Sequence, residues 1–370
     1  MNILINCSNL KKGGGLQVAD SVCCSLKSFD KHRFVVVLSD YLDFTALRIE
    51  KYENVVLVRH NILNSSETLL LGRDAILDEL VEKWNIEVVL TIFGPARWKP
   101  RCKHVCGFAR PHLVLKDSPY FKRMTKKAYI KCKIYNLILK YFFGRGVDVF
   151  WTENPYISKK LEKLFPNKPV YTVSNYYNQV FDQAENCKQI KLPRFEGSTI
   201  LSVNAPYAHK NMEIAIDVAK ILKVNYPNFL FRFVMTMREC DYPLLPKDLK
   251  SNFIFVGKVD ISEIPSLYEQ ADLSFQPSLL ECFTATYPES MRMGVPIVTS
   301  DLDFAHGLCG DAAVYYEAMN AKACSDAIYK VLTDPKLSSK LIDNGKTQLQ
   351  KFDNYRERVN KLINICEICK

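Results

Sequence analysis

Two carboxylates that lie eight residues apart, Glu281 and Glu289, are the side chains whose spacing points most directly to chemistry. The apolar run over residues 271–276 predicts a strand, so Glu281 falls in the loop beyond its carboxyl end, where open α/β sheets bind ligands. A helix expected from about Thr284 would direct its free N–H groups towards an anion at this loop. Glu289, about one turn into that helix, is suited to accept hydrogen bonds from paired sugar hydroxyls. An acid in a first turn also has a purely structural explanation, because it complements the helix dipole.

The stretch around the pair, PSLLECFTATYPESMRMGVPIVTSD, resembles the donor-site signature of the retaining family 4 glycosyltransferases of GT-B fold. The resemblance implies that Glu281 lies beside the donor sugar, that Glu289 holds the nucleotide ribose, and that Phe283 and Thr284 lie near the donor phosphates. The family usually has Gly on both sides of the Phe, where this chain has Cys282 and Thr284. The backbone would therefore approach the phosphates less closely.

The loop over residues 204–211 supplies the candidate cation. We expect a helix from Asn211, capped by that residue, with Lys210 at its positive end. The resemblance implies that Lys210 faces the donor diphosphate and that an Arg belongs where Asn204 stands. His209 or an arginine from elsewhere could replace that charge. The alternative for Lys210 is a solvated surface lysine.

Two further groups are assigned to the donor by resemblance. Lys258 and Val259 follow a predicted strand, where the backbone of GT-B enzymes contacts the nucleotide base. Gly14 and Gly15 belong to a run of three glycines between a predicted strand and helix, where backbone N–H groups can approach an anion. A simple tight turn explains the glycines equally well.

His112 follows the strand predicted over residues 104–108. Family 4 enzymes often carry a His beside the transferred sugar, so the resemblance makes His112 a candidate contact for the sugar or the acceptor. An ordinary loop histidine is the alternative.

Strands that alternate with helices predict an α/β fold with two Rossmann-like domains, whose mostly parallel sheets face each other across a cleft. We expect the acceptor-side domain over residues 1–175, a connection over 176–197 and the donor domain over 198–350. The sequence resemblance covers the donor domain. The last helix, over 351–370, is expected to return to the first domain.

Composition narrows the class of protein. A 370-residue chain with 48% hydrophobic residues can build two globular domains, and it contains no 18-residue apolar segment. The start, MNILINCSNL, has no basic region before its apolar residues, so a cytoplasmic protein is expected. Thirteen cysteines are spread singly, as reduced thiols are. No metal site and no cofactor are expected.

Positive charge is concentrated in one stretch, residues 116–145, which contains eight of the ten net positive charges. Its basic residues are Lys116, Lys122, Arg123, Lys126, Lys127, Lys131, Lys133, Lys140 and Arg145. Apolar residues recur at helical spacing in the same stretch, at Phe121, Met124, Ala128, Tyr135, Ile138 and Phe142. This pattern predicts a basic amphipathic helix that binds an anionic membrane surface. A core-packed helix with a solvated basic face is the alternative; a nucleic-acid partner is not expected, because no nucleic-acid motif accompanies the charge.

Together these observations predict a retaining glycosyltransferase that uses a nucleotide-diphosphate sugar as donor and a glycan or lipid-linked acceptor, in bacterial surface polysaccharide synthesis. Glu281, Lys210 and His112 are its candidate catalytic residues. The expected location is the cytoplasm, at the inner face of the cell membrane. A nucleotide-sugar epimerase of similar architecture and a non-catalytic GT-B partner subunit remain as alternatives, and Asn204 in place of the Arg favours the second.

Overall fold

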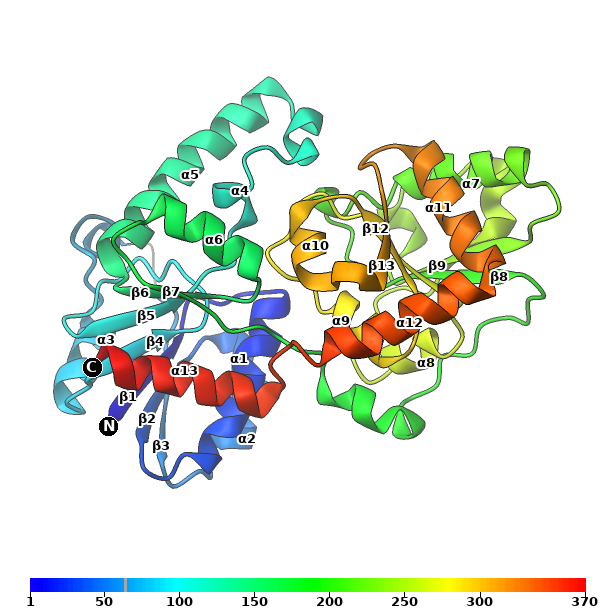
Figure 1. Cartoon of the computed structure of the whole chain (residues 1–370). Coiled ribbons are helices and arrows are strands. Elements are labelled where there is room, and N and C mark those ends of the chain that lie inside the picture. Colours follow the sequence, from blue (N-terminus) through cyan, green and yellow to red (C-terminus); the bar gives the residue numbers. More distant parts are fainter. Residues whose placement is uncertain (63–64) are drawn as a thin grey trace. The chain divides into compact units, whose positions relative to one another are not determined.

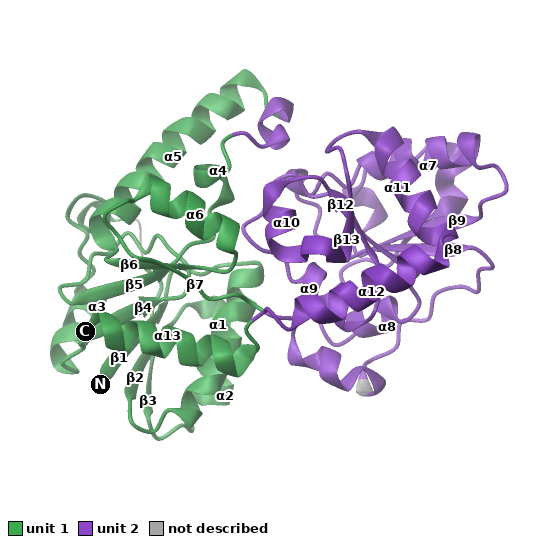
Figure 2. Ribbon diagram, in the orientation of Figure 1, with its two compact units in different colours: residues 1–116, 124–175, 353–370 green, residues 117–123, 176–352 purple. Residues whose placement is uncertain are grey.

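The computed structural model describes residues 1–62 and 65–370 and divides into two compact units (Figure 2). Unit 1 comprises residues 1–116, 124–175 and 353–370, and unit 2 comprises residues 117–123 and 176–352. A seven-residue segment from the N-terminal half of the chain therefore belongs to unit 2.

Unit 1 is built on a seven-stranded parallel sheet of order β3-β2-β1-β4-β5-β6-β7 (Figure 1). Its strands are β1 (Asn2–Cys7), β2 (Arg33–Leu38), β3 (Val55–Arg59), β4 (Val88–Thr91), β5 (Lys103–Gly107), β6 (Val149–Thr152) and β7 (Val170–Thr172). Its helices are α1 (Gly14–Ser25), α2 (Asp43–Ile49), α3 (Ala75–Lys83), α4 (Pro111–Val114), α5 (Lys126–Gly146), α6 (Pro155–Leu164) and α13 (Tyr355–Cys369).

Both faces of this sheet are buried, which explains why its strands are continuous apolar runs and do not alternate with polar residues. Ile3 and Ile5 of β1 pack in one core with side chains of α1 and α13. Leu4 lies between them in sequence and packs in the opposite core with side chains of α3.

Unit 2 contains a six-stranded parallel sheet of order β10-β9-β8-β11-β12-β13, the same order as the first six strands of unit 1. Its strands are β8 (Ser198–Ser202), β9 (Phe231–Met235), β10 (Phe253–Phe255), β11 (Leu273–Gln276), β12 (Ile297–Ser300) and β13 (Ala313–Tyr316). Its helices are α7 (Ile214–Asn225), α8 (Ile264–Tyr268), α9 (Thr286–Arg292), α10 (Asp303–Cys309), α11 (Ala321–Thr333) and α12 (Pro335–Leu349). The direction of winding reverses between β8 and β11, and the carboxyl ends of these two strands form the topological switch point.

Residues 176–197, where the sequence suggests a connection, are part of unit 2. Tyr177 and Phe181 are buried there, and the Phe181 ring lies against Tyr268 of α8. The segment lacks a helical or strand period because its regular part is the 3-10 helix Gln179–Asn186, held by separate aromatic contacts.

The C-terminal helix α13 belongs to unit 1 and packs beside α1 (Figure 1). Arg358 on this helix is buried and donates hydrogen bonds to Asn175 and to Ser21 Oγ, the latter at 2.6 Å. Asp353, just before the helix, accepts a hydrogen bond of 2.8 Å from the Ser174 N–H. Within the described part of the chain, no helix is both long and apolar enough to cross a membrane.

Candidate donor site

The loops that follow β8 and β11 meet at the switch point of unit 2. The Leu279 N–H donates to the His209 carbonyl at 2.8 Å, and Ser202 Oγ donates to the Phe275 carbonyl at the same distance. These bonds join the two loops in which the sequence analysis found the candidate cation and the candidate carboxylate.

Lys210 and Glu281 form an ion pair at this point, with 2.6 Å between Nζ and Oε1. Their side chains are 13% and 11% exposed, so the pair is largely enclosed but still accessible to solvent. The structure thus brings together two predicted residues and excludes the solvated surface lysine. An ion pair with this little solvent contact interacts more strongly than a surface pair, because screening by water is reduced.

His209 lies beside the pair, with its Nε2 3.7 Å from the same Glu281 oxygen. Its ring stacks on Tyr207 with 5.6 Å between centroids. Burial lowers the pKa of His209, an effect that the Glu281 carboxylate opposes and the Lys210 charge reinforces. His209 is therefore neutral near pH 7 and does not replace the positive charge that Asn204 lacks.

Lys210 does not precede a helix as the sequence predicted. It ends a 3-10 turn, Ala208–Lys210, and Asn211 follows with the left-handed φ of 53°. Helix α7 begins only at Ile214, and Asn211 does not cap it. The Asn211 Oδ1 instead accepts a hydrogen bond of 2.7 Å from Arg123. Asparagine tolerates the left-handed region better than most residues, which permits this turn.

Glu289 lies in α9, which begins at Thr286, two residues later than expected. Glu289 is 5% exposed, and the Tyr268 hydroxyl donates to its Oε2 at 3.5 Å. Burial raises the pKa of Glu289 to about 7, although the Tyr268 hydrogen bond and the Lys210 charge both lower it. Near neutral pH this carboxyl therefore gains or loses a proton easily.

Asn204 and the loop around Phe283 have structural contacts of their own. Asn204 Nδ2 donates to Ser202 Oγ and to Gln276 Oε1, both at 3.0 Å, so this side chain bridges the ends of β8 and β11. Thr284 Oγ1 lies 2.9 Å from Thr286 Oγ1, and the Phe283 ring packs edge-on against Phe352. These contacts hold the loop through its side chains, without the flanking glycines.

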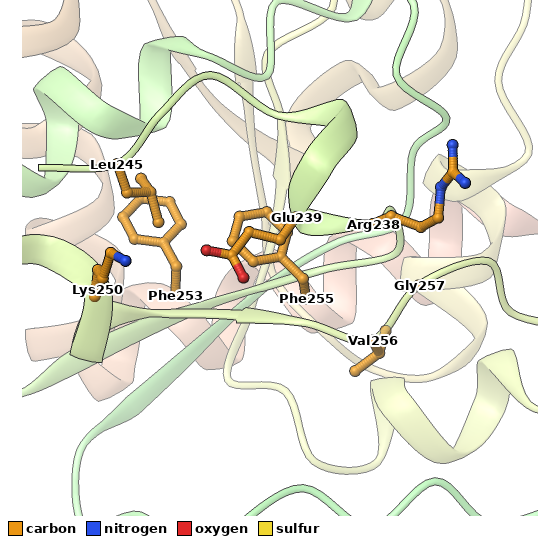
Figure 3. Close-up of a pocket in the computed structure, with 8 residues that line it drawn as sticks. All are labelled: Arg238, Glu239, Leu245, Lys250, Phe253, Phe255, Val256 and Gly257. Atoms are coloured by element: carbon orange, nitrogen blue, oxygen red, sulfur yellow. The ribbon is translucent and has the colours of Figure 1, made fainter.

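A cavity of about 600 Å³ lies beside the ends of β9 and β10 (Figure 3). Its lining consists of Arg238, Glu239, Leu245, Lys250, Phe253, Phe255, Val256 and Gly257. It therefore includes none of Lys210, Glu281 and Glu289. The chain turns at Gly257, whose φ is 76°, so that Lys258 is exposed and Val259 packs partly into the core. Lys258 and Val259, the predicted base contacts, therefore come directly after the cavity-lining residue Gly257 in the sequence.

The remaining predicted residues belong to unit 1. Gly13, with a φ of 77°, precedes α1, which begins at Gly14. A Cβ at Gly14 would have no atom within 4 Å, whereas one at Gly15 would touch Leu10 and Phe93 at 3.5 Å. His112 lies in the short helix α4, and its carbonyl accepts a hydrogen bond of 2.8 Å from Asn136.

One group of residues near the pair was missed by sequence reasoning. Ser118, Tyr120 and Arg123 lie in the segment of unit 2 that comes from the N-terminal half of the chain. Arg123 counted only as one of nine basic residues, and no local pattern links it to residues beyond 200.

Comparison with known proteins agrees with the fold. Residues 184–348 match the family described as glycosyl transferases group 1. Sucrose-phosphate synthase from Thermosynechococcus elongatus is similar in structure, with a TM-score of 0.71 at 14% identity over 99% of this chain and 98% of that chain. The fold is GT-B. A glycosyltransferase from Rickettsia africae gives a TM-score of 0.70 at 14% identity, over 100% of this chain and 98% of that chain. HepE from Anabaena, in complex with UDP and glucose, gives a TM-score of 0.65 at 14% identity, over 100% of both chains.

A curated relative is the O-antigen chain mannosyltransferase RfbU of Salmonella typhimurium, which is 25% identical over 169 residues. The match covers 44% of this chain and about half of the relative, 46%. The predictions of an α/β fold with parallel sheets and of a glycosyltransferase domain in the C-terminal half are confirmed.

Proposed function

We propose that this protein transfers a sugar, with retention of anomeric configuration, from a nucleotide-diphosphate sugar to a glycan or lipid-linked acceptor. The observation that carries the proposal is the Lys210–Glu281 ion pair at the switch point, within the region that matches the glycosyltransferase family. As the bond between sugar and diphosphate breaks, negative charge grows on the leaving phosphate. Lys210 stabilises that charge, and Glu281 accepts hydrogen bonds from the donor sugar. This chemistry requires no metal or cofactor.

Glu289 holds the nucleotide ribose in this proposal. Two ribose hydroxyls would donate to its carboxylate, and hydrogen bonds to the charged form lower a carboxyl pKa. Because burial raises the pKa of the Glu289 carboxyl to about 7, donor binding would release a proton near neutral pH. The base would lie against Lys258 and Val259, next to the cavity at β10. Gly14 and Gly15 remain proposed donor contacts, as do Asn204, His209, Phe283 and Thr284, and His112 remains a proposed contact of the sugar or the acceptor.

Surface polysaccharide synthesis is the biological process we propose, in the cytoplasm at the membrane face. The role of RfbU as an O-antigen chain mannosyltransferase supports an acceptor of this class. The position of the acceptor is suggested by helix α5.

Helix α5 carries an apolar stripe on the side opposite its buried face. Leu139, Phe142 and Phe143 are buried, whereas Ala128, Tyr135 and Ile138, which the sequence placed on the same face as Phe142, are exposed. The exposed aliphatic and aromatic residues Ile130, Ile134, Leu137, Ile138 and Tyr141 are 44–69% exposed. With about 3.6 residues per turn, their spacing places them on one face.

Lysines border this stripe on both sides. From the helical period, Lys131 lies on one side, and Lys126, Lys133 and Lys140 lie on the other, while Lys127 falls within the sector of the stripe, ahead of Ile130. An apolar strip bordered by cations on both sides fits a bilayer surface with anionic headgroups: the strip enters the acyl boundary while the lysines remain at the headgroups. We propose that α5 binds such a surface and holds unit 1 where a lipid-linked acceptor lies.

The membrane proposal is tested by co-sedimentation with anionic and neutral vesicles at low and high salt. Lys131→Glu with Lys133→Glu should lower binding to anionic vesicles by at least about 10-fold, since each lysine contributes about 1 kcal/mol. Lys188→Glu with Lys191→Glu, two exposed lysines of unit 2, is the matched control. Ile134→Ser with Leu137→Ser should also lower binding, and Leu244→Ser should not. Equal binding to neutral vesicles, or equal loss in the control, would contradict a membrane role.

The catalytic proposal is tested by screening nucleotide sugars for release of the nucleoside diphosphate, with and without glycan acceptors. A transferase releases it faster with acceptor. Conversion of a nucleotide sugar into its epimer without acceptor would identify the epimerase instead. Binding of a nucleotide sugar without any release, in every combination, would identify the non-catalytic subunit.

A further inference from the structure

Residues 117–123, which we call the strap, belong to unit 2 (Figure 2) and contact its donor-site loops through Ser118 and Arg123. The chain flanking the strap at both ends, through Lys116 and from Met124, belongs to unit 1. The strap ends in the 3-10 turn Pro119–Arg123. We infer that the strap is a positioning element, which holds the Lys210–Glu281 pair in its geometry from both sides.

One end of the strap holds the loop that carries Glu281. Ser118 Oγ donates a hydrogen bond of 2.6 Å to the carbonyl of Leu279, two residues before Glu281. Leu279 in turn donates its N–H to the carbonyl of His209, the residue before Lys210. The Ser118 hydroxyl also accepts the Tyr120 N–H at 3.1 Å, which fixes the direction of its own donor.

The other end holds the loop that carries Lys210. The Arg123 guanidinium donates to Asn211 Oδ1 at 2.7 Å and forms an ion pair with Glu213. Asn211 and Glu213 follow Lys210 within three residues, whereas Leu279 contacts His209, the residue before it. The planar guanidinium satisfies two acceptors with fixed geometry, which a lysine does not.

The Tyr120 ring meets the His209 ring edge to face, with 6.3 Å between centroids and 88° between planes. The His209 ring thus stacks on Tyr207 and makes a perpendicular ring contact with the strap. The residues on both sides of Lys210 are therefore held: His209 before it, through its carbonyl and its ring, and Asn211 and Glu213 after it, through their side chains. Because Lys210 acts on charge that develops at one atom of the leaving group, a small displacement of its turn would weaken that action greatly.

Arg123 is accordingly a positioning residue, which acts through Asn211, Glu213 and Lys210. Its kinetic role rests on the proposed sugar transfer, but its effect on the two loops does not. The test therefore has two readouts on the full-length chain. The first is hydrogen exchange of the unliganded protein, and the second is steady-state release of nucleoside diphosphate from the donor sugar that the parent protein uses.

Arg123→Ala should accelerate exchange of the Lys210 and Leu279 amides, which donate within these loops, by about 10-fold or more, and leave strand amides of β8 and β11 unchanged. It should lower kcat by about 10–100-fold with little change in donor KM. Arg123→Lys should recover only part of the loss. In the double variant with the pair exchanged, Arg123→Glu with Glu213→Arg, kcat and the exchange rates should be closer to the parental values than in either single variant.

Arg101→Ala, which removes a surface Arg–Glu ion pair of unit 1, is the matched control and should change neither readout. Unchanged exchange at Lys210 and Leu279 in Arg123→Ala would overturn the inference whatever the turnover. Accelerated exchange in a variant that keeps the parental kcat would overturn the role of Arg123 as a positioning residue. If the parent protein turns over no nucleotide sugar, the sugar-transfer proposal fails, while the exchange result still decides whether the strap holds the loops.

Discussion

The loop after β1 in unit 1 and the loop after β8 in unit 2 start from equivalent strands of sheets with the same order. In unit 1, the switch-point loops are joined by Asn9, whose side chain donates to the Phe93 carbonyl at 2.6 Å, and the glycines follow. In unit 2, the corresponding loops hold the ion pair of Lys210 with Glu281. Shared topology therefore provides two positions where a ligand can bind, and the Lys210–Glu281 pair is the reason we propose that the diphosphate binds in unit 2. Four predictions test this contrast.

The largest effect is expected at Lys210. Lys210→Ala should lower turnover by about 10²–10³-fold, because one preorganised positive charge is lost at the leaving group. Steady-state release of nucleoside diphosphate measures it, and unfolding followed by circular dichroism should show a smaller effect on stability. Lys12→Ala, which removes an exposed lysine from the glycine loop of unit 1, is the control. Equal losses in both variants would remove the distinction between the two switch points.

Donor affinity should depend next most strongly on Glu289. Glu289→Ala should weaken nucleoside diphosphate binding by about 2–4 kcal/mol, since two hydrogen bonds to a carboxylate are lost. In the parent protein, affinity should rise between pH 6 and pH 8 as this carboxyl ionises. Isothermal titration calorimetry at both pH values measures both effects. Affinity that stays the same in the variant would show that the ribose lies elsewhere.

The Glu289 carboxyl should also reduce the stability of the protein above neutral pH. Its pKa is about 7 in the folded chain and 4.5 when unperturbed, so the folded state retains a proton that the unfolded state releases. Its contribution to the free energy of unfolding is thus fully present below the unperturbed pKa and is lost as pH rises through 7. Glu289→Gln should therefore stabilise the protein by about 1–3 kcal/mol at pH 8 and much less at pH 5.

Chemical denaturation at both pH values tests this effect. Circular dichroism is the suitable signal, because Trp84, Trp98 and Trp151 all lie in unit 1. A gain of the same size at pH 5 and pH 8 would contradict titration of Glu289 in this window.

The smallest effects are expected in the glycine loop of unit 1. Gly13→Ala should cost about 1–3 kcal/mol, because a φ of 77° with a ψ of −165° is nearly restricted to glycine. Gly14→Ala should change stability by less than about 1 kcal/mol, since its Cβ meets no atom. Tryptophan fluorescence during denaturation measures both. If Gly14→Ala nevertheless lowers turnover, the glycine loop lies close to a bound ligand. If turnover stays at the parental level, Gly14 has only a structural role in the turn.

Sequence reasoning was most successful where the information is local. The apolar run over residues 271–276 predicted a strand, and β11 is a buried strand of a parallel sheet, because a strand covered on both faces favours apolar residues. The pair of Glu281 and Glu289 was found from spacing within one loop and helix. The start of α7 was wrong, because Asn211 is a capping residue by type but binds Arg123 in the folded chain.

The sequence by itself determined the α/β class, the repeated strand and helix units, and the types of charged residue near the carboxyl ends of β8 and β11, since each depends on neighbours within a few turns of chain. Only the tertiary structure decided that Lys210 contacts Glu281, that Asn204 bridges two strands, that Ile134 and Leu137 are exposed, and that Arg123 reaches the donor loops. These contacts join residues distant in sequence. They form because the parallel sheet fixes which loops meet at its edge, and no local pattern of residues contains that information.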